Sequence, residues 1–405
     1  MGHRRSMRIQ PFGLAFIAFR FSRNSYFHVA FSVLYFQSLG FSLATALSLE
    51  SFYYIAKAGC EVPCGVFADS VGRKLTLVLG SLAAASCYLG LGLCDQYWQM
   101  MLFEAGLGLS MSMASGTDSA LVYDEYKALA KTAEYEHVES IGWGMRNIAR
   151  GVASAFGSLF ATWYTMGSTF ILTSIAIFMS APVAAIFLKE GGRRKTSLGA
   201  VVASAASLVR RNAEYRRVLL QFAIITIGVK AGFWAFQPFS DLHHLPLEWI
   251  GTCFTALLFI SLVASFFVKR ICRVFGLLHT QTALIVAAFA IMSLSFASEG
   301  KAGILIVSLG LALHAIAQGI SDPIMRILIN RYADSDSRAT AMSVASMAGD
   351  GSFSLVAPLF GYLIDKQGGA AASIAIVAVT LCSLYPDLIK LHQAGMKKQT
   401  VHKRG

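Results

Sequence analysis

Ionisable side chains recur inside long apolar segments of this chain, where they could exchange protons or bind a charged solute. His314, Gln318 and Asp322 follow one another at four-residue intervals, so a helix would place them on one face. Glu104 and Asp350 are the best isolated acids in apolar surroundings. Because loss of water disfavours the charged form of a carboxyl group, such an acid can gain or lose a proton when its surroundings change.

The candidates for proton exchange are five acids that lie inside the apolar segments or near their ends: Glu104, Asp350, Asp118, Asp322 and Glu61. Asp118 and Asp322 lie near segment ends, where structural hydrogen bonding or gating competes with solute contact. Glu61 follows Lys57 by four residues, which favours a structural pair on one helix over a transport site. A partner arginine would keep Glu104 or Asp350 ionised.

A second set of polar and aromatic side chains could line the binding site of a small organic solute: Arg20, Arg23, Phe27, Tyr35, Arg146, Arg150, Lys230, Trp234, Gln237, His314 and Gln318. The excess of bases in this set favours an anionic or amphiphilic solute, such as a carboxylate-bearing metabolite or a siderophore. The alternative is that the bases pair with the acids Glu104, Asp118 and Asp350.

Membrane-spanning helices are the elements that must position these residues. Of the 405 residues 56% are hydrophobic and only 14% are charged, whereas soluble domains carry about 25% charged residues. Apolar runs long enough to cross a bilayer recur along the whole chain. The sequence therefore predicts an all-α integral membrane protein with twelve transmembrane helices, at about 12–38, 43–67, 75–94, 98–122, 140–163, 168–188, 216–239, 247–268, 279–297, 302–326, 339–364 and 369–388.

The basic residues gather in alternate connections between these runs, as the positive-inside rule requires. Arg73 and Lys127 mark two of the basic connections, while the opposite connections hold only Lys301 and Lys366 beside several acids. This pattern predicts a multi-pass protein of the inner membrane with both termini in the cytoplasm. It also accounts for the net charge of +12 without a nucleic-acid partner.

Motifs for metal binding and for common enzyme chemistry are missing from the sequence. Cys60 and Cys64 lie one helical turn apart, but nothing nearby completes a zinc site, so no metal is expected. There is no P-loop, no G-x-S-x-G and no H-E-x-x-H motif. We therefore expect neither ATP-driven pumping nor hydrolase chemistry, and no cofactor.

A polar segment near the middle of the chain separates two halves that resemble each other. An offset of 204 residues, the difference between Gly276 and Gly72, also places Asp118 on Asp322. Six spans in each half give a parallel repeat, which predicts two six-helix bundles about a pseudo-twofold axis normal to the membrane. The expected division is an N-terminal bundle, a cytoplasmic linker with a short surface helix, a C-terminal bundle and a basic cytoplasmic tail, at residues 1–188, 189–215, 216–390 and 391–405.

The connection between the second and third runs carries the most specific motif. Residues 65–74 read GVFADSVGRK, which resembles the loop motif G-x-x-x-D-x-x-G-R-K of the major facilitator superfamily (MFS). Residues 61–65, EVPCG, resemble the opening of this motif in bacterial drug and metabolite exporters. The resemblance implies a gating latch formed by Gly65, Asp69, Gly72, Arg73, Lys74 and Arg338.

The same resemblance implies a monomeric secondary transporter with alternating access, in which helices one, four, seven and ten line the cavity. It further implies export of a small-molecule substrate by antiport, driven by the proton gradient across the lipid bilayer. Two departures weaken antiport: Glu104 stands where the family has an arginine, and residues 150–157 lack the proline of the fifth-helix motif. Proton-coupled uptake of a nutrient or siderophore is the alternative, and a non-transporting membrane receptor or enzyme is a remote one.

Overall fold

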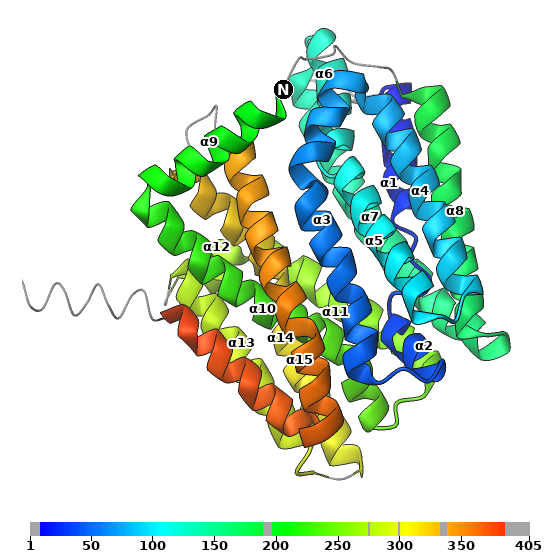
Figure 1. The fold of residues 1–405 in the computed structure, drawn as a ribbon, viewed down its shortest axis with the longest axis vertical. Coiled ribbons are helices and arrows are strands. Elements are labelled where there is room, and N and C mark those ends of the chain that lie inside the picture. Colours follow the sequence, from blue (N-terminus) through cyan, green and yellow to red (C-terminus); the bar gives the residue numbers. More distant parts are fainter. Residues whose placement is uncertain (1–8, 189–196, 274–275, 299, 333–337, 385–405) are drawn as a thin grey trace, which may run out of the picture. The chain divides into compact units, whose positions relative to one another are not determined.

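The structure, a computed structural model, describes residues 9–188, 197–273, 276–298, 300–332 and 338–384. All regular secondary structure in these residues is helical (Figure 1). The chain divides into two compact units. Unit 1 comprises Met1–Ala203 and Ser240–Leu258, and unit 2 comprises Ser204–Phe239 and Phe259–Gly405.

Unit 1 is built from antiparallel helices of the N-terminal half. The helices that lie wholly within its described residues are α1 (Pro11–Arg23), α2 (Ser32–Ser38), α3 (Leu43–Val71), α4 (Arg73–Leu93), α5 (Tyr97–Ala114), α6 (Thr117–Ala128), α7 (Thr132–Trp163) and α8 (Met166–Phe187). The α5 helix packs against α3 and α4, and α1 packs against α7 and α8. These contacts bring the charged positions of α1, α3, α5 and α7 into one unit.

Unit 2 is built mainly from the helices of the C-terminal half. Those within its described residues are α12 (Val268–Ile271), α13 (Leu277–Ser295), α14 (Gly300–Tyr332), α15 (Arg338–Leu381) and the short 3-10 helix Cys382–Leu384. Three helices cross the division between the units: α9 (Leu198–Arg211), α10 (Ala213–Leu242) and α11 (Leu247–Phe266). The α9 helix lies in the predicted linker and buries none of its residues, as expected for a surface helix.

Seven described helices are long and apolar enough to cross a membrane: α4, α8, α10, α11, α13, α14 and α15. The other long helices carry more polar and charged side chains, including Glu50 on α3, Glu104 on α5 and Arg150 on α7. The prediction of an all-α membrane protein is therefore confirmed. Each of the twelve predicted runs corresponds to a single helix, to part of a longer helix, or to two helices separated by a break.

Two predicted runs are broken, which the apolar pattern did not reveal. The run 12–38 divides into α1 and α2, because the side chain of Asn24 donates a hydrogen bond of 2.7 Å to the carbonyl of Arg20 and closes the end of α1. The run 98–122 divides into α5 and α6 at Gly116, which has a left-handed backbone with φ of 70°.

The connections at Gly72 and Gly276 have the same backbone character, in line with the predicted repeat. Gly72 joins α3 to α4 with φ of 133°, and Gly276 precedes α13 with φ of 78°. Residues other than glycine rarely adopt such angles because the Cβ atom would clash. The last two predicted runs, as far as Leu381, lie in α15, which is interrupted at Gly368, whose φ of 82° and ψ of 168° are not helical. Residues 385–388 of the last run lie outside the described residues.

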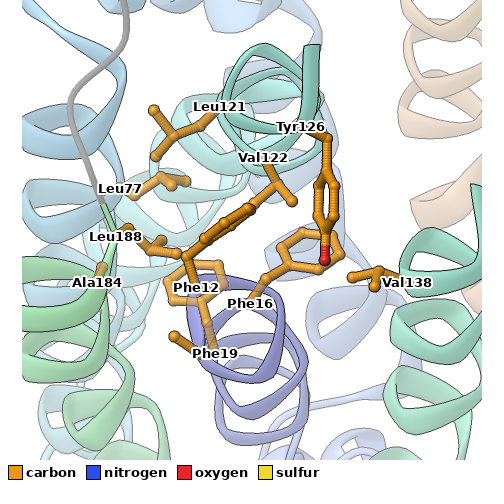
Figure 2. Packing of buried hydrophobic residues seen from close by; sticks show 11 residues of the cluster. Phe12, Phe16, Phe19, Leu77, Leu121, Val122, Tyr126, Val138, Ala184 and Leu188 are labelled. Atoms are coloured by element: carbon orange, nitrogen blue, oxygen red, sulfur yellow. The ribbon is translucent and has the colours of Figure 1, made fainter. Parts of the chain in front are cut away.

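An apolar cluster surrounds the first turns of α1 in unit 1. Figure 2 shows the rings of Phe12, Phe16 and Phe19 packed among aliphatic side chains from other helices. The partners come from α4, α6, α7 and α8 and include Leu77, Leu121, Val122, Tyr126, Val138 and Ala184. This cluster fixes α1 so that its next turn carries Arg20 toward α6 and α7.

Candidate functional site

Arg20 lies between two acids at the end of the α1 cluster. Its Nε donates a 2.8 Å hydrogen bond to Oδ2 of Asp118 on α6, and its Nη2 lies 2.9 Å from Oε1 of Glu139 on α7. Its guanidinium carbon lies 4.3 Å from the centre of the Phe16 ring. Arg20 was predicted to contact solute and Asp118 to exchange protons, but the structure pairs them with each other. Glu139 was not predicted, because it lies in a turn of α7 before the apolar run begins.

The loop motif forms a second ion-pair group where α3 meets α4. Arg73 Nη2 lies 3.0 Å from Oδ1 of Asp69, and its Nη1 lies 2.8 Å from Oδ2 of Asp124 on α6. Asp69 is in the last turn of α3, and Arg73 begins α4, so each charge faces the unfavourable end of a helix dipole. The pair of Asp69 with Arg73 offsets both of these unfavourable dipole interactions.

Three further residues of the predicted latch lie on α3, α4 and α15. Gly65 is exposed within α3, and Lys74 is half-buried on α4. Arg338 begins α15, but its side chain lies outside the described residues. Asp124 was not among the predicted site residues, although it lies in the stretch 115–124 that resembles exporter sequences.

Asp69→Asn should slow transport turnover more than it weakens solute binding. The half-buried pair contributes about 1 kcal/mol or less to stability, and Asp124 still holds Arg73, so the fold should persist. A latch, by contrast, must break and reform in each transport cycle. Counterflow rates and binding in proteoliposomes measure the two effects separately. Glu125→Gln, a change to the neighbouring half-buried acid on α6, is the matched control, and equal turnover in both variants would rule out the latch.

Two acids of unit 1 are buried on adjacent helices. Glu104 on α5 and Glu50 on α3 are each 5% exposed, and these helices pack directly against one another. Both lie within electrostatic range of Tyr88 on α4, as does Arg23 of α1. Glu50 was not among the predicted site residues, because it lies near the start of its apolar run, where a charged residue is less unusual than in the middle.

Arg23 is held in this region by a short chain of hydrogen bonds. It is 5% exposed, and its Nη2 donates a 2.7 Å hydrogen bond to Oγ of Ser110. Ser110 in turn donates one of 2.6 Å to the carbonyl of Gly80 on α4. The Nε of Arg23 is buried and has no hydrogen-bond partner among the described residues. One end of the guanidinium is thus fixed to the scaffold.

Arg146 and Arg150 lie one turn apart on α7. The guanidinium carbon of Arg146 is 5.0 Å from the Trp143 ring, and that of Arg150 is 5.7 Å from the ring of Tyr26. Among the described residues neither arginine forms an ion pair or a hydrogen bond, and Nε of Arg150 is buried without a partner. Unlike Arg20, they retain their capacity to bind an anion.

Two aromatic candidates from the first predicted run pack within unit 1. The hydroxyl of Tyr35 donates a 2.9 Å hydrogen bond to the carbonyl of Leu91, and its ring lies 4.8 Å from that of Phe170. Phe27 is half-buried with its ring 6.0 Å from that of Phe156. Tyr35, predicted to contact solute, is therefore part of the packing between helices.

In unit 2 the central charged group is an ion pair between α10 and α15. Lys230 Nζ lies 2.7 Å from Oδ1 of Asp350, and the two side chains are 17% and 7% exposed. The ammonium also lies 5.9 Å from the centre of the Phe353 ring. The expectation that Asp350 is an isolated acid is wrong, because its partner comes from a distant helix. Trp234 and Gln237, on the same helix as Lys230, are also buried.

The three polar residues predicted to share one face of α14 differ in burial. His314 is buried, and its Nε2 donates a 2.9 Å hydrogen bond to the carbonyl of Val229 on α10. A Cβ atom at Gly232 would collide with the imidazole, so the glycine makes room for it. Gln318 is half-buried, and Asp322 is exposed within unit 2. Regular spacing placed these residues on one face, but burial changes along that face.

Glu61, the last of the predicted proton-exchange candidates, is half-buried on α3. It accepts a 3.0 Å hydrogen bond from the hydroxyl of Ser115, which follows the end of α5. Glu61 therefore lies beside the break between α5 and α6, away from the buried acids Glu50 and Glu104.

Sequence comparison shows what this chain is similar to. The profile of the Major Facilitator Superfamily matches residues 12–357. Multidrug resistance protein MdtG of Enterobacter lignolyticus is 26% identical over 171 residues, which cover 40% of this chain and 38% of that protein. MdtG of Salmonella paratyphi A is 25% identical over the same length. The matched segment thus spans about two fifths of the length of these curated relatives.

Solved structures share the fold at low sequence identity. A point mutant of the nucleoside transporter NupG superposes with a TM-score of 0.74 at 9% identity, covering 93% of this chain and 99% of NupG. A POT family transporter in complex with 5-aminolevulinic acid gives 0.69 at 12% identity, covering 92% and 95%. With a profile match over most of its length and this fold, the chain belongs to the Major Facilitator Superfamily.

Proposed function

We propose that this member of a transporter family exports a small organic solute in exchange for protons. The observation that carries the proposal is the pair of acids Glu104 and Glu50, both 5% exposed and on adjacent helices of unit 1. Such groups are rare within apolar helices and are retained where they serve ion or solute movement.

The surroundings of Glu104 suit a group that takes up and releases a proton. Cys87 of α4 lies within electrostatic range of Glu104, and Tyr88 of α4 lies within range of Glu104, of Glu50 on α3 and of Arg23 on α1. Burial disfavours the charged form of a carboxyl group, and Arg23 supplies one positive charge to the same region. Protonation of Glu104 removes the cost of its buried charge, and exposure to water on the other side of the membrane restores ionisation. Alternating exposure of Glu104 would then couple proton movement to the transport cycle.

The direction of transport is supported by resemblance to the exporters. The matched relatives are named multidrug resistance proteins, and the loop motif of residues 61–74 resembles that of bacterial exporters. Proton-coupled uptake is the second candidate, because residues 150–157 lack the proline of the antiporter motif. The same proton-exchanging acid would serve either direction.

We also propose the membrane arrangement that the sequence predicts. Six-helix bundles at residues 1–188 and 216–390 are supported by the matching glycine backbones of Gly72 and Gly276. The alternation of basic and non-basic connections supports cytoplasmic termini. Placement in the inner membrane as a monomer is expected from the family resemblance.

The test uses purified protein in proteoliposomes loaded with the pH-sensitive dye pyranine. A panel of cationic, neutral and anionic organic solutes is added with the lumen either acidic or alkaline. Antiport predicts solute accumulation and proton release when the lumen is acidic, whereas symport predicts accumulation when the exterior is acidic. No solute-dependent proton movement in either gradient would overturn proton coupling.

Glu104→Gln should abolish this solute-dependent proton flux, because glutamine cannot carry a proton between the two sides. Exchange of labelled for unlabelled solute at equal pH should persist, since the substitution keeps the size of the side chain. Glu136→Gln, a change to an exposed acid on α7, is the matched control. Full proton flux in Glu104→Gln would assign the coupling to another group.

A further inference from the structure

Two arginines of α7 carry positive charge into unit 1 without a protein counter-charge. Within the described part of the chain Arg146 and Arg150 form no ion pair and no hydrogen bond. Arg20, which lies in the same unit, has two carboxylate partners. The contrast shows that unit 1 contains acids able to neutralise an arginine, yet none is placed beside this pair.

The surroundings of Arg150 are aromatic and polar rather than acidic. Its charge is repelled by Arg146, and the side chains of Tyr26, Tyr53 and Tyr88 lie within electrostatic range. Tyr26 and Tyr88 are 5% and 8% exposed, and their ring centres lie 6.1 Å apart. The site thus combines two positive charges with aromatic surfaces and hydroxyl groups from three other segments.

Such an arrangement is costly unless a negative group completes it. Arg146 and Arg150 are half-buried, and a charge that is partly removed from water without a partner loses hydration that nothing restores. Like charges one turn apart add repulsion. Guanidinium groups bind carboxylates and phosphates through paired N–H donors. The buried Nε of Arg150, which has no partner, is one donor left for such a ligand.

We infer that Arg146 and Arg150 bind the anionic group of the transported solute, which is a small aromatic or amphiphilic carboxylate. The guanidinium groups receive the carboxylate, and the rings of Tyr26 and Tyr88 contact the apolar part of the solute. That the bound anion is also the transported solute rests on the proposed transport function. Binding itself requires no proton gradient, so the two proposals can fail separately.

The experiment measures binding of benzoate to the purified, delipidated full-length protein in detergent, by calorimetry and by the shift in melting temperature. Benzyl alcohol and benzylamine have the same ring with a neutral and a cationic group. Benzoate should bind and stabilise, whereas the other two should bind about tenfold more weakly or worse, as expected for loss of a charge-assisted hydrogen bond. Equal binding of benzyl alcohol, or no binding of benzoate, would overturn the assignment.

Arg146→Gln and Arg150→Gln should each weaken benzoate binding about tenfold or more. Arg150→Gln should also raise the melting temperature of the ligand-free protein, because it removes repulsion and a partly desolvated charge. A misfolded variant would lower it, so the two readouts together separate loss of the site from loss of the fold. Arg211→Gln, at the exposed end of α9, is the matched control and should change neither quantity.

Anionic lipid is the other source of a suitable negative group. Phosphatidylglycerol added in mixed micelles should leave benzoate binding unchanged if the site serves a small solute. Competition by phosphatidylglycerol, but not by phosphatidylcholine, would identify a lipid headgroup as the occupant and contradict the inference. Retention of benzoate binding in both arginine variants would contradict it as well.

Discussion

Asp350→Asn is expected to destabilise unit 2 by about 3–5 kcal/mol, the usual cost of removing one partner of a buried ion pair. Asp350 and Lys230 lie 2.7 Å apart, and their side chains are only 7% and 17% exposed. Asparagine keeps the shape of the side chain but leaves the ammonium without this counter-charge. Lys230→Gln should have a similar cost, since it leaves the carboxylate in the same position.

The double variant Lys230→Gln/Asp350→Asn is the decisive measurement. Because it removes both charges, much of the lost stability should return, giving a coupling free energy of about 2–3 kcal/mol in a double-mutant cycle. Unfolding in detergent, followed by denaturant or heat, measures the four proteins. Lys301→Gln, a change to an exposed lysine on α14, is the control. Single variants no more destabilised than this control would show that the pair does not hold α10 to α15.

The helices were predictable because their cause is local. An apolar run of about twenty residues needs no tertiary information to be recognised as a membrane helix. The ends of these runs were less predictable. The break after Arg23 depends on the side chain of Asn24 reaching back to a carbonyl, and the break at Gly116 depends on a left-handed backbone. Neither alters the local hydropathy enough to be seen.

The alternative that the bases pair with acids holds for Asp118 and Asp350, but which base meets which acid was not predictable, because each pair joins residues that are distant in the sequence. Arg20 of α1 pairs with Asp118 of α6, and Lys230 of α10 pairs with Asp350 of α15. The sequence identified these residues as charges that lipid would not tolerate, but not which of them neutralise one another. The isolated-acid interpretation was therefore wrong for Asp350, whereas Glu104 is buried on α5, which packs against the helix of a second buried acid, Glu50.

Arg20→Gln is expected to destabilise unit 1 by about 3 kcal/mol, at the low end of the range for a broken buried ion pair. Arg20 is 8% exposed as a side chain, and its acids Asp118 and Glu139 are 16% and 23% exposed, so water reaches them in part. Without the guanidinium, the two carboxylates on α6 and α7 face each other with no cation between them. The loss should appear as a lower melting temperature of the ligand-free protein in detergent.

Arg150→Gln is expected to shift the melting temperature in the opposite direction from Arg20→Gln, although both variants remove one positive charge. Both variants replace an arginine of unit 1 by glutamine, but Arg20 neutralises two acids while Arg150 is repelled by Arg146. The triple variant Arg20→Gln/Asp118→Asn/Glu139→Gln removes all three charges and should regain most of the stability lost in Arg20→Gln. If Arg20→Gln and Arg150→Gln shift the melting temperature in the same direction, pairing does not govern the cost of these charges. Opposite shifts would mean that the first arginine serves the fold and the second is kept, at a cost in stability, for a ligand.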